Sequence, residues 1–193
     1  MFKIICVTNR LLCDNFLECI ESLHKNKIPV ILREKDLSLT DYTRLAATVK
    51  EICPDVIAHY YPKAAKDVGI DKIHLPLHLM TTDIRNEFST VGISVHSVDE
   101  AIEAQNMGAD YVTAGHIFST DCKKDLKPRG IDFLKTVAKS VHIPVYAIGG
   151  IKPENISEIV NTGAAGCCIM SGFMKCDDIS KYILSLTEYT SAK

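Results

Sequence analysis

Residues 110–124, DYVTAGHIFSTDCKK, place a titratable ring and several cations directly after an apolar run. The run predicts a buried strand over residues 111–114. The loop that follows it holds His116, Ser119, Thr120, Asp121, Cys122, Lys123 and Lys124. An imidazole, which titrates at about pH 6.5 in an unstructured peptide, can accept a proton and return it near neutral pH. The segment therefore predicts the edge of an active site, although a hydrogen-bonded loop histidine would show the same pattern.

Two further apolar runs end in small residues. Residues 143–151, IPVYAIGGI, end in the pair Gly149 and Gly150, and residues 166–172, GCCIMSG, end in Met170, Ser171 and Gly172. Small side chains at a strand end let backbone amides approach an anion closely. The loops after the seventh and eighth strands of a (β/α)8 barrel are a recurrent phosphate site. We expect phosphate binding here, while the alternative is that the glycines only turn the chain.

The elements that must position these loops alternate along the whole chain. Apolar runs and amphipathic runs follow one another, which predicts parallel strands with helical crossovers and a compact (β/α)8 TIM barrel in a single domain of residues 1–193. The predicted strands cover residues 3–8, 29–32, 56–59, 72–75, 92–95, 111–114, 145–148 and 166–170.

Apolar residues three and four apart predict helices over residues 16–24, 39–52 and 98–107, with shorter ones over residues 63–68 and 82–88. Ser97 and Glu100 form a capping-box pattern at a helix start. Gly108 and Gly163 each close a helical run before an apolar strand, which is typical of C-terminal caps.

Composition limits the classes of function. The chain has 193 residues, 47% of them hydrophobic, a formal net charge of −2 and a pI near 6.4. These values favour one enzyme-sized globular domain and argue against a nucleic-acid partner or a membrane partner. The eight cysteines lie mostly in apolar segments and lack zinc-finger spacing, and the start of the chain does not read as a signal peptide, so we expect reduced thiols in a cytoplasmic protein. The sequence leaves a homo-oligomer open.

Polar residues at the predicted strand ends indicate an anionic small-molecule ligand. Arg33, Lys35 and Lys123 supply cations, and Glu34 lies between the first two. His59 fits a ligand contact and a filler equally well, whereas we expect His74 and His96 to be buried and hydrogen-bonded. His24, His78 and His142 are expected at the surface or in loops.

The ordered segments LREK (32–35), VGIDKIHLP (68–76), GISVHSVDEA (92–101), GADYVTAGHIFSTDCKK (108–124), IPVYAIGGI (143–151) and GAAGCCIMSG (163–172) together resemble the thiamine phosphate synthase and thiazole tautomerase superfamily. The resemblance covers nearly the whole chain. It implies a compact (β/α)8 barrel that acts on a thiazole phosphate in thiamine biosynthesis.

The resemblance also implies which branch to expect. In the synthase branch, two aspartates hold a magnesium ion against a pyrimidine diphosphate. The Asn-Asp pair of that motif falls on His59 and Tyr60 here, and the second aspartate falls near Leu79. A phenol and an isobutyl group cannot replace hard anionic ligands for magnesium, so we expect no metal site. The Arg33-Glu34-Lys35 segment fits the tautomerase branch least well, because the synthase uses that motif for the pyrophosphate; it could persist as a carboxylate contact or a salt bridge at the rim.

The loop after the sixth strand reads Gly-His-x-Phe-x-Thr-Asp-Cys-Lys-Lys, a form similar to the thiazole tautomerase branch. The resemblance implies that a dihydrothiazole carboxylate phosphate is isomerised to the aromatic carboxythiazole phosphate with no cofactor. It makes His116 the catalytic acid/base, and Lys123 would stabilise the developing negative charge. The substrate-binding residues predicted from the resemblance and the strand ends are Arg33, Lys35, His59, Ser94, Thr120, Cys122, Gly149, Gly150, Met170, Ser171 and Gly172.

Two other functions remain open from the sequence. The chain could be a divergent thiamine phosphate synthase, or a non-catalytic regulator that binds a thiazole phosphate.

Overall fold

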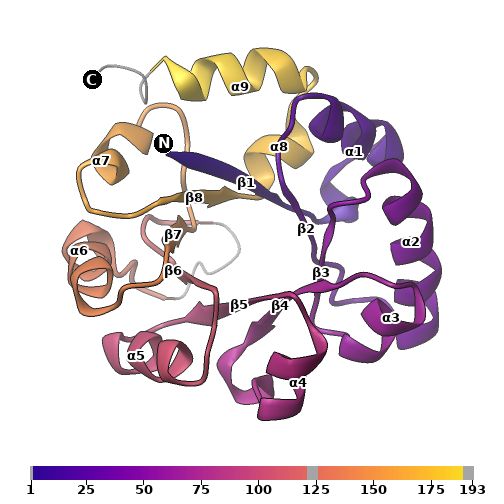
Figure 1. Cartoon of the computed structure of the whole chain (residues 1–193). Coiled ribbons are helices and arrows are strands. Elements are labelled where there is room, and N and C mark those ends of the chain that lie inside the picture. The colour runs from indigo at the N-terminus through magenta and orange to yellow at the C-terminus, as the bar shows by residue number, and fades with distance from the viewer. Residues whose placement is uncertain (1, 121–125, 189–193) are drawn as a thin grey trace.

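The computed structural model describes residues 2–120 and 126–188, which form a closed parallel barrel surrounded by helices (Figure 1). The described part of the chain contains eight strands in sequential order. They are β1 (Lys3–Val7), β2 (Val30–Leu32), β3 (Ile57–His59), β4 (Lys72–Pro76), β5 (Thr90–Val95), β6 (Tyr111–Gly115), β7 (Val145–Ile148) and β8 (Gly166–Ile169). The predicted (β/α)8 barrel is confirmed.

Pairing between the first and last strands closes the barrel, with Lys3 opposite Gly166 and Cys6 opposite Ile169. The closure requires a glycine, because a Cβ at Gly166 would lie 1.9 Å from the carbonyl oxygen of Lys3. The carboxyl ends of all the strands therefore meet at one rim, where barrels of this type place their chemistry.

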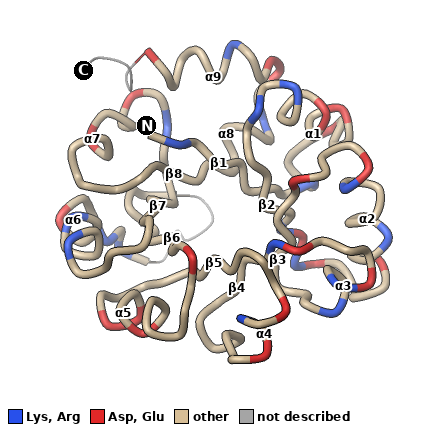
Figure 2. The backbone as a smooth tube through the Cα atoms, viewed as in Figure 1, with Lys and Arg blue, Asp and Glu red and all other residues tan. Residues whose placement is uncertain are grey.

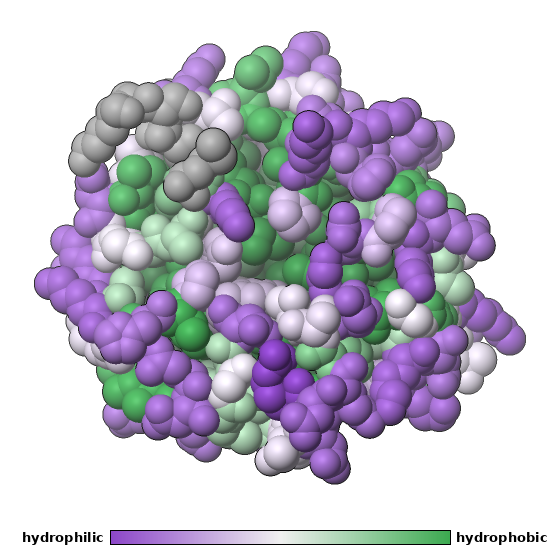
Figure 3. All heavy atoms as spheres, in the orientation of Figure 1, coloured by the Kyte–Doolittle hydropathy of each residue, from purple (hydrophilic) through white to green (hydrophobic). Residues whose placement is uncertain are grey.

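Helices pack around the outside of this barrel. They are α1 (Phe16–Lys25), α2 (Leu39–Ile52), α3 (Pro62–Asp67), α4 (Thr82–Glu87), α5 (Val98–Asn106), α6 (Gly130–Ser140), α7 (Ile156–Val160), α8 (Ser171–Lys175) and α9 (Ile179–Thr187), with 3-10 turns η1 (Arg10–Leu12) and η2 (Leu77–Leu79). The charged residues lie mostly on these helices and loops, and hydrophilic residues cover most of the periphery in the view shown (Figures 2 and 3).

Sequence periodicity explains the helical layer. Helix α2 buries Tyr42, Ala46 and Val49, which are spaced four and three residues apart and therefore share one face. Its first residue follows Ser38, whose hydroxyl accepts a hydrogen bond from the Asp41 amide. The predicted cap glycines Gly108 and Gly163 have φ values of +89° and +88°, a conformation that glycine adopts without strain.

The predicted capping box at α5 forms in a modified way. The Ser97 hydroxyl accepts a hydrogen bond from the Glu100 amide at 3.0 Å, as expected. The Glu100 carboxylate reaches back to the amide of His96 instead of that of Ser97. The side chain thereby fixes the backbone where β5 leaves the barrel.

The core has two parts. The larger one lies between the strands and the helices, and the smaller one fills the barrel interior with seven side chains: Ile5, Val7, Ile31, Ile57, Tyr111, Tyr146 and Cys168. Ile5 and Val7 are two residues apart on β1, as the alternation of a pleated strand requires. Within residues 2–120 and 126–188, no helix has the length and apolar character that a membrane crossing needs.

Candidate active site

A cavity of about 380 Å³ opens at the carboxyl ends of the strands, above the interior core. Every strand, or the loop that follows it, contributes to its lining. Ten of the predicted site residues lie in this lining: Arg33, Lys35, His59, Ser94, His116, Thr120, Gly149, Gly150, Met170 and Ser171. The structure therefore brings together residues that lie as far apart in the sequence as Arg33 and Ser171.

Three predicted residues stand apart from this group. Gly172 is not in the lining; it lies in α8, where a Cβ would be 1.9 Å from the Tyr182 hydroxyl, so its small size lets α8 approach α9. Cys122 and Lys123 lie outside the described residues. Their predicted roles stay predictions.

His116 follows β6 and is 6% exposed. Its Nε2 atom lies 3.2 Å from the carbonyl oxygen of Leu126. A carbonyl oxygen only accepts hydrogen bonds, so this contact assigns the ring proton to Nε2 and leaves Nδ1 with a free electron pair. In the neutral form of the ring, this contact leaves Nδ1 as the nitrogen able to take a proton.

The glycine pair after β7 holds the His116 loop in place. Gly149 has φ +100°, and a Cβ there would lie 2.4 Å from the His116 Cβ; Gly150 has φ +68° and its Cβ would collide with the backbone of Phe118. The amide of Phe118 also donates to the Gly149 carbonyl at 3.0 Å. The glycines thus serve the close packing of two loops, in addition to any role in binding an anion.

Two buried histidines lie deeper in the cavity. The rings of His59 and His74 stack with their centroids 5.8 Å apart. Burial lowers the pKa of His59 to about 2, with a smaller contribution from His74, and lowers the pKa of His74 to about 3. Both rings are therefore neutral at physiological pH.

The Nδ1 atom of His59 is buried and has no hydrogen-bond partner among the described residues. An orphaned nitrogen of this kind beside a cavity indicates a place for a ligand or a water molecule. His74, in contrast, has partners for both ring nitrogens, Tyr111 and Ser94. The expectation that His74 is buried and satisfied is confirmed, and it lines the cavity as well.

Cations gather at the end of β2. Glu34 is buried and accepts hydrogen bonds from the Thr8 hydroxyl at 2.5 Å and from the Arg10 backbone and guanidinium. The Thr8 hydroxyl accepts in turn from the Arg33 amide at 2.9 Å. This network fixes the β2 loop so that Arg33 and Lys35 line the cavity. Glu34 itself forms a salt bridge with the Arg10 guanidinium at 3.2 Å, one of the two roles left open for this segment.

The chemistry of the lining does not fit a magnesium ion held by carboxylates. Among the described residues, the lining contains no aspartate or glutamate, and no group of three or more potential metal ligands comes together. Tyr60, at the predicted place of a magnesium aspartate, is 38% exposed, and the Lys35 ammonium lies 5.8 Å from the centre of its ring. An ammonium at this point favours an anion over a divalent cation.

Sequence reasoning missed the lining residues Pro76 and Thr113, and it placed Asn9, His74 and His96 at strand ends without giving them a role in ligand binding. The signal that could have found them is the alternation along each strand, since inward-facing positions continue two residues at a time into the cavity. The expectation that His96 is buried is wrong, because it follows the end of β5 and is exposed, but its ring is hydrogen-bonded, with Nδ1 2.9 Å from the Gly115 carbonyl oxygen. The remaining histidines, His24, His78 and His142, are exposed as predicted.

Among the described cysteines, Cys168 is the one that lines the cavity. All seven are free of disulfide bonds. Cys168 lines the cavity, but burial raises the pKa of its thiol well above the usual value, which disfavours the nucleophilic thiolate.

Comparison with known proteins assigns the family. A family model described as "Thiamine monophosphate synthase" matches residues 4–173. A protein of Fusobacterium nucleatum named thiamine-phosphate synthase is 34% identical over 193 residues, covering 94% of this chain and 93% of its own. Another of the same name, from Clostridium novyi, is 33% identical, covering 92% of this chain and 93% of its own.

A solved structure gives the same result. The structure described as thiamine phosphate pyrophosphorylase from Pyrococcus furiosus is 28% identical and superimposes with a TM-score of 0.84, covering 98% of this chain and 96% of that chain. With a closed (β/α)8 barrel, a cavity at its carboxyl rim and these relatives, the chain belongs to the thiamine monophosphate synthase family.

Proposed function

We propose that this protein is a thiazole tautomerase, which converts a dihydrothiazole carboxylate phosphate into the aromatic carboxythiazole phosphate. The observation that carries the proposal is the described cavity lining, which has four imidazoles and two cations but no carboxylate. Such a lining suits a substrate with two anionic groups and a proton transfer. It does not suit a metal-bound diphosphate.

The proposed reaction moves one proton. His116 takes the proton from the ring carbon that bears the carboxylate, through the free electron pair on Nδ1. The electron pair of the broken C–H bond shifts into the ring. The side-chain carbon of the exocyclic double bond gains electron density and becomes the atom that accepts a proton. The protonated His116 returns the proton to that carbon, which leaves an aromatic ring and a neutral imidazole. Atoms and charge balance without a cofactor.

Other residues bind and orient the substrate in this proposal. The backbone of Gly149 and Gly150, with Ser171, surrounds the phosphate at the ends of β7 and β8. Arg33 and Lys35 attract the carboxylate from the β2 side of the cavity. Lys123, which lies outside the described residues, remains the proposed cation for the charge that develops during proton abstraction. We propose that the protein acts in the cytoplasm, where its substrate would be made.

The test follows the aromatic thiazole absorbance after addition of the dihydrothiazole substrate. Wild type should accelerate the appearance of this absorbance over the uncatalysed reaction. His116→Ala should lose about 10²–10⁴-fold in kcat, the usual contribution of a general acid/base. His142→Ala removes an exposed imidazole and serves as the matched control.

A second candidate is thiamine phosphate synthase, and the names of the relatives at 33% and 34% identity favour it. This activity would join a pyrimidine diphosphate to a thiazole phosphate and release pyrophosphate in the presence of magnesium. If thiamine phosphate forms at least as fast as the enzyme isomerises the dihydrothiazole, the synthase function is favoured. Binding of thiazole phosphate with neither turnover would instead indicate a regulator.

A further inference from the structure

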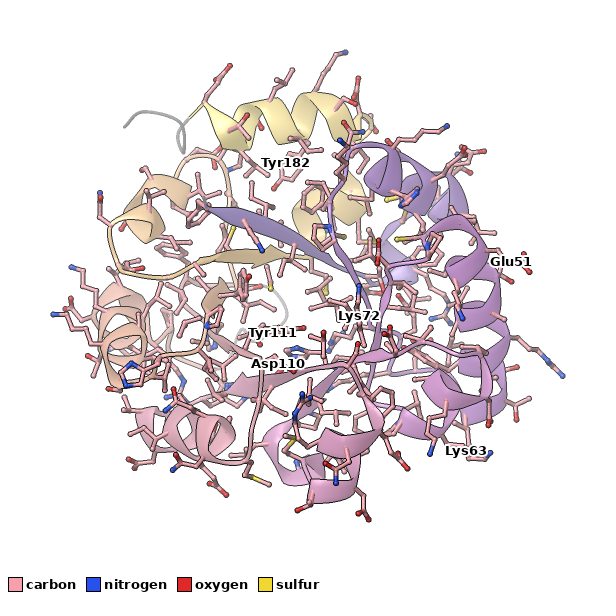
Figure 4. The ribbon with its side chains drawn as sticks, in the orientation of Figure 1. Glu51, Lys63, Lys72, Asp110, Tyr111 and Tyr182 are labelled. Carbon is pink, nitrogen blue, oxygen red and sulfur yellow. The ribbon has the colours of Figure 1, made fainter. Side chains whose placement is uncertain are left out.

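Three neighbouring strands place His74, Gly92 and Tyr111 side by side. His74 pairs with Gly92 between β4 and β5, and Gly92 pairs with Tyr111 between β5 and β6. A Cβ at Gly92 would lie 2.0 Å from the Tyr111 Cζ atom, so the tyrosine ring occupies the space that any other residue would fill. Tyr111 lies in the barrel interior (Figure 4). Its hydroxyl reaches across β5 to within 3.1 Å of His74 Nδ1.

The opposite edge of the His74 ring, which carries Nε2, lies at the cavity. Its Nε2 atom lies 2.8 Å from the Ser94 hydroxyl oxygen. Thr113 supports this contact, since its hydroxyl lies 3.4 Å from both the Ser94 oxygen and His74 Nε2. His74, Ser94 and Thr113 line the cavity, and Tyr111 does not. A hydrogen-bond chain therefore runs from the buried core to the cavity surface.

Burial of Tyr111 gives this chain a direction. The residue is only 7% exposed, and His74 is the hydrogen-bond partner of its hydroxyl in the described part of the chain. If His74 donated from Nδ1, the buried Tyr111 proton would have no acceptor, which is costly. Tyr111 must therefore donate to Nδ1, so the neutral His74 carries its proton on Nε2 and donates to Ser94.

The direction determines what Ser94 offers to the cavity. The Ser94 oxygen accepts from His74 Nε2 and from Thr113, so both of its electron pairs are engaged. Its own proton is then free to point to a ligand. The result is a neutral donor whose orientation is fixed before the ligand arrives.

We propose that Tyr111 and His74 are positioning residues that fix the Ser94 hydroxyl as a hydrogen-bond donor to the negative charge formed on the substrate. The catalytic consequence rests on the proposed tautomerase function, in which proton abstraction spreads negative charge over the ring and carboxylate. A donor aimed at that charge stabilises the transition state more than the ground state. The hydrogen-bond chain itself does not depend on the reaction.

The first experiment measures the His74 tautomer by long-range ¹H–¹⁵N NMR of the wild-type protein with labelled imidazoles. The chain predicts a proton on Nε2 and none on Nδ1. A proton on Nδ1 overturns the proposal. Tyr111→Phe should abolish the preference for Nε2–H. Tyr146→Phe, which removes another hydroxyl from the same interior core, should preserve it.

The second experiment measures steady-state kinetics with the dihydrothiazole substrate. Tyr111→Phe should lower kcat about tenfold and leave KM within about twofold, because the donor acts mainly in the transition state. Tyr146→Phe should retain wild-type values. An unchanged kcat in Tyr111→Phe overturns the positioning role. If wild type itself gives no turnover, the proposed function fails, and the NMR result still decides the hydrogen-bond chain.

Discussion

The Nε2 atom of His116 lies 3.2 Å from the carbonyl oxygen of Leu126, a partner that can only accept a hydrogen bond. The loop after β6 thus selects the tautomer of its own histidine. The same residue is packed against Gly149, whose missing side chain makes room for it. Position and tautomer of the proposed base are both set by backbone atoms, which reduces the cost of orienting it in the complex.

Gly149→Ala tests the packing of this loop. The added Cβ would lie 2.4 Å from the His116 Cβ at a φ of +100°, so the variant should displace the ring and lower kcat by about 10²-fold or more. The measurement is turnover together with the melting temperature. Gly163→Ala is the matched control, because it has φ +88° and its nearest neighbour is 3.6 Å away. Equal losses of activity in the two variants would contradict a specific effect on His116.

Gly92→Ala tests the close approach of Tyr111. A Cβ placed 2.0 Å from the tyrosine ring must push it away, and overpacking of a core typically costs about 1–3 kcal/mol of unfolding free energy. Urea denaturation measures this loss. Truncation of the ring in the double variant Gly92→Ala, Tyr111→Ala should make the added methyl group much less costly. A cost that stays the same in both backgrounds would show that Tyr111 is not the obstacle.

The buried histidines predict a pH dependence of stability. The pKa of His59 is about 2 in the folded protein because burial disfavours the charged ring, whereas an unfolded histidine titrates near pH 6.5. Below about pH 6.5 the unfolded chain therefore binds a proton that the folded chain excludes, and this part of the stability decreases as the pH falls toward about 2.

His59→Asn removes the imidazole that binds this proton in the unfolded chain. The free energy of unfolding should then fall less steeply between about pH 6 and pH 4, by about 1.4 kcal/mol per pH unit, the value of one proton. Urea denaturation at a series of pH values gives the slope. His142→Asn is the control, and it should follow the wild-type curve. An identical slope for His59→Asn would refute the neutral, buried state of this ring.

The cations after β2 predict an effect on substrate affinity. Arg33→Gln should raise KM about tenfold or more with a smaller change in kcat, because a carboxylate contact exists in both the ground state and the transition state. Steady-state kinetics separate the two constants. Arg44→Gln, on the exposed face of α2, is the control. A fall in kcat at constant KM would instead place the Arg33 contact in the transition state alone.

Most of the barrel could be predicted from the sequence. The helix predicted over residues 39–52 has the bounds of α2, because a clear apolar face coincides with a serine cap at Ser38. The strand predicted over residues 92–95 begins two residues earlier, at Thr90. The predicted helices omit α6, α8 and α9. Helix α9 carries a local signal, since Ile179, Ile183 and Leu186 are spaced four and three residues apart behind the Asp178 cap, whereas α8 has only five residues and shows no clear period.

The candidate site was predictable only in part. The strand-end pattern identifies His116 and the glycine pair, which line one cavity. The contact between Tyr111 and His74 depends on the register of three strands and on the absence of a side chain at Gly92. Such a relationship follows from tertiary structure and leaves no local signal in the chain.

The most direct test of the account is the rate at which the aromatic thiazole absorbance appears with wild type and with His116→Ala. We predict that wild type accelerates the isomerisation without added metal, and that His116→Ala loses about 10²–10⁴-fold in kcat while it still binds the carboxythiazole phosphate product. Equal rates for the two proteins would contradict the central claim that His116 carries the proton.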